Sequence, residues 1–254
     1  MESLIIFDCD GVLVDSETLT TAVEAQLLTE LGYPHTVQDV VDQYMGRSAA
    51  EVAGLLEAMM GAELADQFDA DSTAQIHESF DSSLAVVPGI PALLDALDDN
   101  GVRTCVASSG SHAKMKRTLG LTGLRSRFEG RIYSATEVPR GKPAPDIFLH
   151  AAASEGVPAE QCVVIEDSVN GVRAARAAGM RVLGYGGGLS DRAALEAAGA
   201  EVFERMDHVW PLLSGVNELS RRTDQSLSSE ESAVSVSTRP SLSSDCNTSA
   251  APSS

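Results

Sequence analysis

The sequence predicts an α/β protein with a parallel sheet, helices on both faces of that sheet, and an inserted α-helical cap. Two observations carry this prediction. Short apolar runs alternate with Ala-rich stretches of helical periodicity, and one long interval near the start contains helical pattern only. The chain has 254 residues, of which 43% are hydrophobic and 22% charged, so it is long and apolar enough for such a core.

Six short apolar runs are the expected strands. They cover residues 4–7, 102–107, 131–134, 162–165, 181–185 and 201–203. Helical stretches follow them, at residues 90–100, 111–119, 146–155, 168–178, 191–198 and 206–213. Apolar strands that alternate with helices are typical of a Rossmann-like parallel sheet with both faces covered.

The expected cap follows the first strand. Residues 18–31, 37–44, 49–60 and 63–84 have helical pattern, and no strand is evident between them. We therefore expect a core domain from residues 1–15 and 86–216 and a helical cap from residues 16–85. Residues 217–254 are rich in serine and too polar to bury a core, which predicts a disordered tail.

The charge of the chain excludes several classes of protein. It has 18 Lys and Arg against 37 Asp and Glu, a net charge of −19. Such a chain repels nucleic acid and anionic membranes. No apolar run approaches the length of a membrane span, and the start MESLIIFDCD lacks the basic segment of a secretory signal. Four scattered cysteines show no metal-binding spacing. We expect a cytoplasmic monomer with reduced thiols.

Polar residues follow the predicted strands at the points where these end. They are Asp8, Asp10, Ser108, Ser109, Glu166 and Asp167, and Lys142 precedes a helix. Because the ends of parallel strands meet at one edge of a sheet, we expect these groups to converge there. Several carboxylates in one place require a cation, and oxygen ligands suit Mg²⁺. A lysine and a serine suit the oxygens of a phosphoryl group, so the set predicts metal-assisted phosphoryl transfer.

The order of these residues resembles the four motifs of the haloacid dehalogenase (HAD) superfamily. The segment DCDGVLVDS, from Asp8 to Ser16, is similar to the DxDGxxxDS motif of its phosphatases. The segment VAS ending at Ser108 resembles the second motif, Lys142 in GKPAPD the third, and Glu166-Asp167 in VVIEDSVNG the fourth. The resemblance runs in order from residue 3 to about residue 213 and is closest to the β-phosphoglucomutase-like subfamily with a helical cap.

The resemblance implies a role for each motif residue. Asp8 would be the nucleophile that forms an aspartyl-phosphate, and Asp10 the general acid and base. The Asp8 side chain, the Asp10 backbone carbonyl and Asp167 would hold Mg²⁺, with Glu166 close by or bound through water. Ser108 and Lys142 would hold the phosphoryl oxygens, and Ser109 would add a further contact. A second aspartate fits phosphate esters, because an alkoxide leaving group needs a proton and a halide does not.

Arg47 is the only Lys or Arg in the first 102 residues. It follows Gly46, and its segment resembles a substrate-contacting loop of related sugar-phosphate enzymes, so Arg47 is a substrate-binding candidate. The alternative is a salt bridge with a neighbouring acid of the cap. Lys114 and His112 begin a helix beside the site, and we expect both to be solvated.

The predicted activity is hydrolysis of a small phosphorylated metabolite, namely a sugar, sugar-acid or polyol phosphate. A β-phosphoglucomutase-like mutase is the alternative, although the cap lacks the histidine and lysine that those enzymes use. Phosphonoacetaldehyde hydrolases need a cap lysine, and no lysine precedes Lys114. A binding module that has kept the fold without catalysis remains a third hypothesis.

Overall fold

A computed structural model describes residues 4–45, 47 and 49–214. Residues Met1–Ser214 form one compact unit. Its centre is a six-stranded sheet in the order β3-β2-β1-β4-β5-β6 with every pair parallel. The strands are β1 (Leu4–Phe7), β2 (Arg103–Ser108), β3 (Ile132–Ser134), β4 (Cys162–Glu166), β5 (Arg181–Tyr185) and β6 (Glu201–Phe203).

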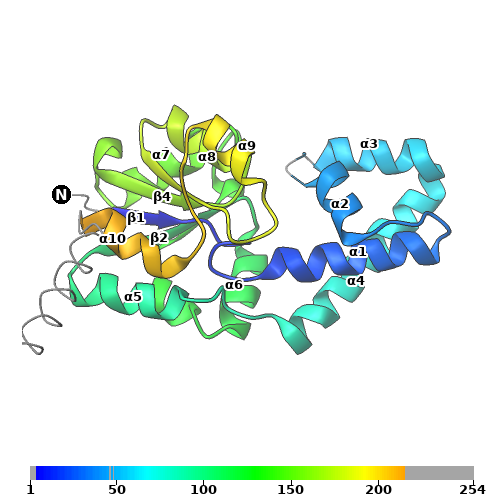
Figure 1. Cartoon of the computed structure of the whole chain (residues 1–254), viewed down its shortest axis with the longest axis horizontal. Coiled ribbons are helices and arrows are strands. Elements are labelled where there is room, and N and C mark those ends of the chain that lie inside the picture. Colours follow the sequence, from blue (N-terminus) through cyan, green and yellow to red (C-terminus); the bar gives the residue numbers. More distant parts are fainter. Residues whose placement is uncertain (1–3, 46, 48, 215–254) are drawn as a thin grey trace, which may run out of the picture. The chain divides into compact units, whose positions relative to one another are not determined.

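Helices cover both faces of the sheet (Figure 1). One face carries α5 (Ile90–Asp99), α6 (His112–Leu121) and α10 (Val209–Ser214), and the other carries α7 (Asp146–Ser154), α8 (Val169–Ala177) and α9 (Arg192–Ala198). The central strand β1 alternates between the two cores. Ile5 and Phe7 pack on the first face, Leu4 and Ile6 on the second, and all four are buried. This double burial explains why β1 has no polar residue.

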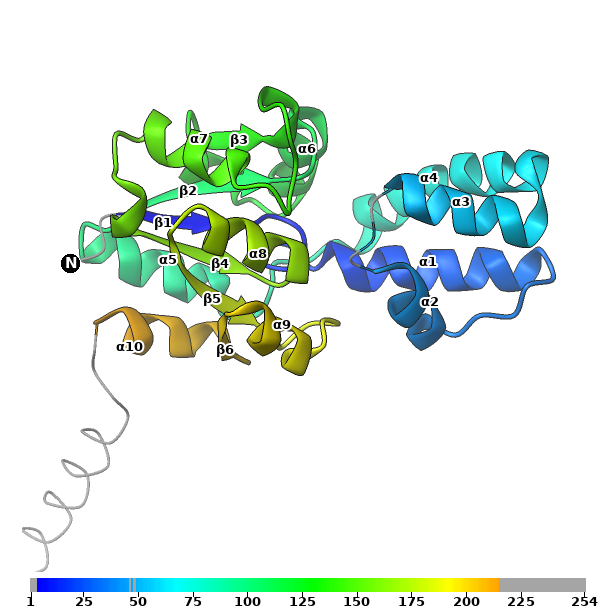
Figure 2. The same cartoon turned by 90° about the horizontal axis from the view of Figure 1, so that it is seen from above.

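Four helices follow β1: α1 (Ser16–Glu30), α2 (Val37–Tyr44), α3 (Ala49–Met60) and α4 (Ala62–Ser83). They pack on one another around their own core, which includes Leu28, Val40, Leu56 and Phe68 (Figure 2). Thr36 starts α2 with a capping box, in which its hydroxyl accepts from the Asp39 backbone N–H and Asp39 accepts from the Thr36 backbone N–H. These four helices have a core separate from the two cores of the sheet.

The chain enters and leaves the helical segment at one place. The backbone N–H of Asp15 donates to the Ala85 carbonyl at 2.9 Å, and that of Val87 donates to the Leu13 carbonyl at 3.1 Å. Val14 and Val86 form an antiparallel bridge between these bonds. The two linkers therefore form a short paired ribbon.

The fold class and all six predicted strands are confirmed, with ends that differ by one residue at most. The four helices lie within the residues expected for the cap, whereas the domain boundaries themselves stay a prediction. The expected tail and Cys246 lie outside the described residues, and Cys9, Cys105 and Cys162 are buried free thiols. Within residues 4–214 as described, no helix has the length and apolar character needed to cross a membrane.

Candidate active site

The carboxyl ends of β1 and β4 bring three carboxylates together. Phe7 and Ile165 are paired in the sheet, and the Asp8 backbone N–H donates to the Ile165 carbonyl at 2.9 Å. Asp8, Glu166 and Asp167 therefore leave two adjacent strands side by side, and all three are buried. The position of these residues at the ends of the strands predicts that they lie close together, and the structure places them so.

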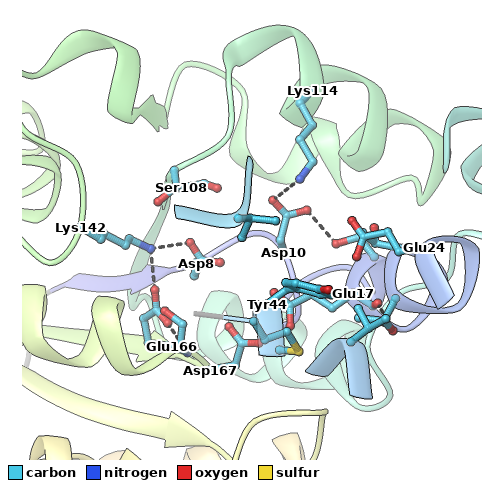
Figure 3. A pocket seen from close by; sticks show the side chains of 18 of the residues that line it. Asp8, Asp10, Glu17, Glu24, Tyr44, Ser108, Lys114, Lys142, Glu166 and Asp167 are labelled. Carbon is cyan, nitrogen blue, oxygen red and sulfur yellow. Dashed lines mark hydrogen bonds and ion pairs between the residues drawn. The ribbon is translucent and has the colours of Figure 1, made fainter. Parts of the chain in front are cut away.

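Lys142 joins two of these carboxylates. Its Nζ lies 2.6 Å from Asp8 Oδ1 and 2.5 Å from Glu166 Oε1, with only 5% of its side chain exposed (Figure 3). Burial opposes the charge on Lys142, but Asp8 and Glu166 outweigh this effect and raise its pKa. Glu166 also accepts from the Ser168 backbone N–H at 2.7 Å, at the start of α8. Lys142 thus remains a cation that the two acids hold in place.

The remaining negative charge is only partly compensated. Burial raises the pKa of Asp8 to about 7, although Lys142 lowers it, and Glu166 and Asp10 raise it further. Burial, Glu17, Glu166 and Asp8 also raise the pKa of Asp167 well above its usual range. Burial and the neighbouring acids raise the pKa of Glu17, at the start of α1, to about 7. Glu17 therefore lies close enough to Asp167, at the end of β4, for its charge to raise the pKa of that acid.

Two glycines make room for the acids of β4. A Cβ on Gly11 would lie 2.1 Å from Asp167 Oδ2, and a Cβ on Gly171 would lie 1.7 Å from Glu166 Oε1. Gly11 also has a positive φ of 73°, which other residues rarely adopt. The carboxylates can therefore approach the backbone only because these two positions lack side chains.

Asp10 is held by two groups from different elements. The Ser16 hydroxyl donates to Asp10 Oδ1 at 2.7 Å, and Lys114 Nζ donates to Asp10 Oδ2 at 2.8 Å. Lys114 is exposed as expected, with 44% of its side chain accessible to solvent, but its ammonium group is also bound to an acid of the site. The interaction crosses 104 residues of sequence, and no local signal marks it. His112 instead is exposed and lies 3.2 Å from Glu137.

The serines after β2 lie beside the same carboxylates. Ser108 is buried, and its hydroxyl accepts from the Gly110 backbone N–H at 3.1 Å. Ser109 is exposed, and both serines line the pocket described below. Ser108 and Ser109 therefore line the same pocket as Asp8 and Lys142.

Arg47 is placed elsewhere. Its side chain is exposed, its Nε donates to the Gln43 carbonyl at 2.6 Å, and it is not among the described residues that line the pocket. Arg47 as a substrate-binding residue stays a prediction that this arrangement does not support.

A cavity of about 340 Å³ opens from Asp8 toward the helical segment. Besides the residues above, α1 to α4 line it with Thr20, Thr21, Glu24, Leu28, Val40, Tyr44, Met45, Val52, Leu56 and Phe68. In the view of Figure 3, Asp10 lies between Lys142 on one side and Glu24 on the other. Sequence reasoning missed Glu17 and Glu24, whose spacing of seven residues places them on one face of α1.

The donor chemistry fits a divalent cation. Among the described residues that line the pocket there are six carboxylates, from Asp8, Asp10, Glu17, Glu24, Glu166 and Asp167, and two ammonium groups, from Lys114 and Lys142. Oxygen-only donors suit Mg²⁺, which would offset the negative charge that these carboxylates bring together. Among the described residues, no three His, Cys, Asp or Glu side chains already form a metal-binding group. The carboxylate oxygens of these residues are thus of the donor type that Mg²⁺ prefers.

Comparison with known proteins identifies the family. The profile of the haloacid dehalogenase-like hydrolases matches residues 3–179, which is most of the chain. The chain belongs to this family. It is thus a HAD hydrolase, and the prediction of an enzyme of the HAD phosphatase type is confirmed.

Individual relatives agree with this assignment. The HAD hydrolase is 31% identical to 6-phosphogluconate phosphatase of Escherichia coli, over 70% of this chain and 80% of the relative. It is 33% identical to protein SUPPRESSOR OF QUENCHING 1 of Arabidopsis thaliana, over 92% of this chain but 22% of that longer protein. A haloacid dehalogenase-like protein of unknown function from Agrobacterium tumefaciens is 36% identical with a TM-score of 0.78, covering 85% of this chain and 99% of the other. Relatives at 29–30% identity are phosphatases of phosphorylated carbohydrates and hexitols.

Glu24 provides a test of the electrostatics at the cap side of the pocket. Burial raises its pKa from 4.5 to about 7, so the folded protein binds a proton that the unfolded chain releases between these values. The free energy of unfolding therefore falls as the pH rises from about 4.5 to about 7. Allowing for solvent contact, we expect Glu24→Gln to raise the free energy of unfolding by about 1–2 kcal/mol at pH 8 and to leave it nearly unchanged at pH 5.

Urea denaturation at the two pH values measures this difference. Glu30→Gln is the matched control, because it removes the same charge from an exposed site on the same helix. An equal effect of Glu24→Gln at pH 5 and pH 8 would show that the Glu24 carboxylate is not destabilised by its surroundings.

Proposed function

We propose that this HAD hydrolase is a phosphomonoesterase that acts on a small phosphorylated metabolite of the sugar, sugar-acid or polyol class. The observation that carries the proposal is the group formed by Asp8, Asp10 and Lys142 at one end of the pocket. In this group one carboxylate is bound to a lysine and a second is held by Lys114 and Ser16. The relatives that dephosphorylate carbohydrates and hexitols support the substrate class.

The proposed reaction has two half-reactions. An oxygen of Asp8 forms a bond to phosphorus while the ester P–O bond breaks, and Asp10 donates its proton to the leaving oxygen. Asp10 then takes a proton from a water molecule, whose oxygen forms a new bond to phosphorus and releases the Asp8 carboxylate. The products are the alcohol and inorganic phosphate, and Asp10 regains its proton in the second step.

Lys142 and Ser108 would bind the transferred group. The ammonium of Lys142 lies at Asp8 Oδ1, where it would meet both the attacking oxygen and a phosphoryl oxygen. Its second partner, Glu166, prevents the long side chain from turning away. Ser108 and Ser109, from the end of β2, would donate to the other phosphoryl oxygens.

Mg²⁺ would be held by the Asp8 side chain, the Asp10 backbone carbonyl and Asp167, with Glu166 close by. When bound, the ion would neutralise part of the negative charge of the phosphoryl group and of these carboxylates.

The first test is phosphate release from a panel of sugar, sugar-acid and polyol phosphates, with Mg²⁺ and with EDTA. We expect release with Mg²⁺, no release with EDTA, and loss of turnover in Asp8→Asn, because the amide cannot act as the nucleophile. Circular dichroism would check that Asp8→Asn is folded. Conversion of β-glucose 1-phosphate to glucose 6-phosphate without phosphate release would favour the mutase. No turnover of any ester would favour the binding module.

The role of Asp10 predicts a dependence on the leaving group. In Asp10→Asn, kcat/KM for an alkyl phosphate such as a hexitol phosphate is expected to fall by about 100-fold or more, because the alkoxide no longer receives a proton. For p-nitrophenyl phosphate the fall is expected to be much smaller, because p-nitrophenolate leaves without a proton. Steady-state kinetics with the two esters measures the difference.

Lys114 positions Asp10, so its loss should also affect the alkyl ester more than p-nitrophenyl phosphate. Lys114→Met removes one of the two groups that hold Asp10, so kcat/KM is expected to fall by about tenfold for the alkyl ester and less for p-nitrophenyl phosphate. Lys114→Arg, which retains the charge, should recover part of the loss. Lys116→Met on the same helix is the control. Equal losses with both esters would contradict a role for Lys114 through Asp10.

A further inference from the structure

The cap side of the pocket presents one face of α1. Glu17, Thr20 or Thr21, Glu24 and Leu28 follow one another at intervals of three or four residues, and all of them line the cavity. Going along the helix from its first turn, this face has an acid, hydroxyls, a second acid and then apolar side chains. The groups nearest to Glu24 are therefore hydrogen-bond acceptors and hydroxyls.

The cations of the pocket are already engaged. Among the described residues that line it, Lys142 and Lys114 are the two basic side chains, and each is bound to carboxylates of the core. Arg47 donates to a backbone carbonyl outside the lining. The part of the pocket formed by α1 to α4 therefore offers no described positive group to a second anion.

Glu24 is a carboxylate of this part of the pocket that has no partner among the described residues. It forms no hydrogen bond or ion pair with any residue that the structure describes, although it is half-buried in the cavity wall. Tyr44, from α2, lies close enough that the charge of Glu24 raises its pKa together with burial. The Tyr44 hydroxyl is itself 3.3 Å from His35 Nε2. The acceptor oxygens of Glu24 are therefore open to water, or to a ligand in the cavity that donates hydrogen bonds.

We infer that Glu24 is a specificity-determining residue that selects esters with a neutral, hydroxyl-bearing chain and rejects esters with a second negative charge. The inference rests on the proposed phosphatase activity and narrows its substrate class to polyol and neutral sugar phosphates. A substrate hydroxyl can donate a hydrogen bond to the Glu24 carboxylate. A substrate carboxylate is instead repelled by it, because both groups are negative and the cavity screens their charges less than bulk water does. This specificity differs from that named for the Escherichia coli relative, which is a 6-phosphogluconate phosphatase.

Two esters form a matched pair for the test. Glucitol 6-phosphate and 6-phosphogluconate have the same chain and the same phosphate, and they differ only in CH₂OH or COO⁻ at the far end. At pH 8, above the pKa of about 7 that burial gives Glu24, we expect the wild type to have a kcat/KM at least about tenfold higher for glucitol 6-phosphate. Erythritol 4-phosphate and 4-phosphoerythronate give the same comparison for a shorter chain.

Glu24→Gln separates the charge from the shape of the side chain. The amide keeps the size of the side chain and a hydrogen-bond acceptor but removes the charge. The ratio of kcat/KM for glucitol 6-phosphate to that for 6-phosphogluconate is therefore expected to fall toward one, chiefly because turnover of 6-phosphogluconate rises. Glu30→Gln, on the exposed end of the same helix, should leave the preference as in the wild type.

The outcomes distinguish this inference from the proposed function. Equal or better turnover of the acid in the wild type, or an unchanged preference in Glu24→Gln, overturns the role of Glu24 while the phosphatase stands. The role of Glu24 is also overturned if the enzyme hydrolyses other phosphate esters but none of the four esters of the two matched pairs. Absence of phosphate release from every ester in the panel rejects the phosphatase, and the inference with it.

Discussion

The ion pair between Lys142 and Asp8 is the interaction on which the rest of the site depends. β1 and β4 are adjacent and parallel, so their ends place Asp8, Glu166 and Asp167 in one buried space. Without a cation that space would hold only like charges. Lys142 reaches this space from a loop and bonds to Asp8 and Glu166. Gly11 leaves room for Asp167, and Gly171 leaves room for Glu166.

The two parts of the pocket differ in the charges of their side chains. The core side has both ammonium groups of the described lining, and we place the transferred phosphoryl group there. The cap side has Glu17 and Glu24 without a lysine or arginine of its own. A pocket with this polarity holds one end of a substrate as an anion and the other as a donor of hydrogen bonds. Substrate orientation then follows from charge as well as from shape.

Much of this arrangement could be predicted from the sequence. Buried parallel strands are short continuous apolar runs, so β1 and β4 can be recognised in the sequence. The polar residues at the end of each run then lie at the same edge of the sheet. Lys114 could not be placed in this way, because its contact with Asp10 depends on how α6 packs beside β1. Glu24 lies on a helix that buries residues on more than one side, so periodicity does not show which face meets the pocket. The prediction for Arg47 rests on its rarity and on the resemblance of its segment to a substrate-contacting loop, and neither determines where a side chain points.

The paired linkers at Val14 and Val86 give the helical segment adjacent ends. A segment inserted through a single ribbon can be replaced by another of different length without a change in the order or register of the strands. The groups that would select the alcohol can thus change while the strands stay the same, provided that the first turn of α1, whose Ser16 holds Asp10, is kept. Exchange of whole caps between related chains is a route to new substrates that leaves the sheet and its acids intact.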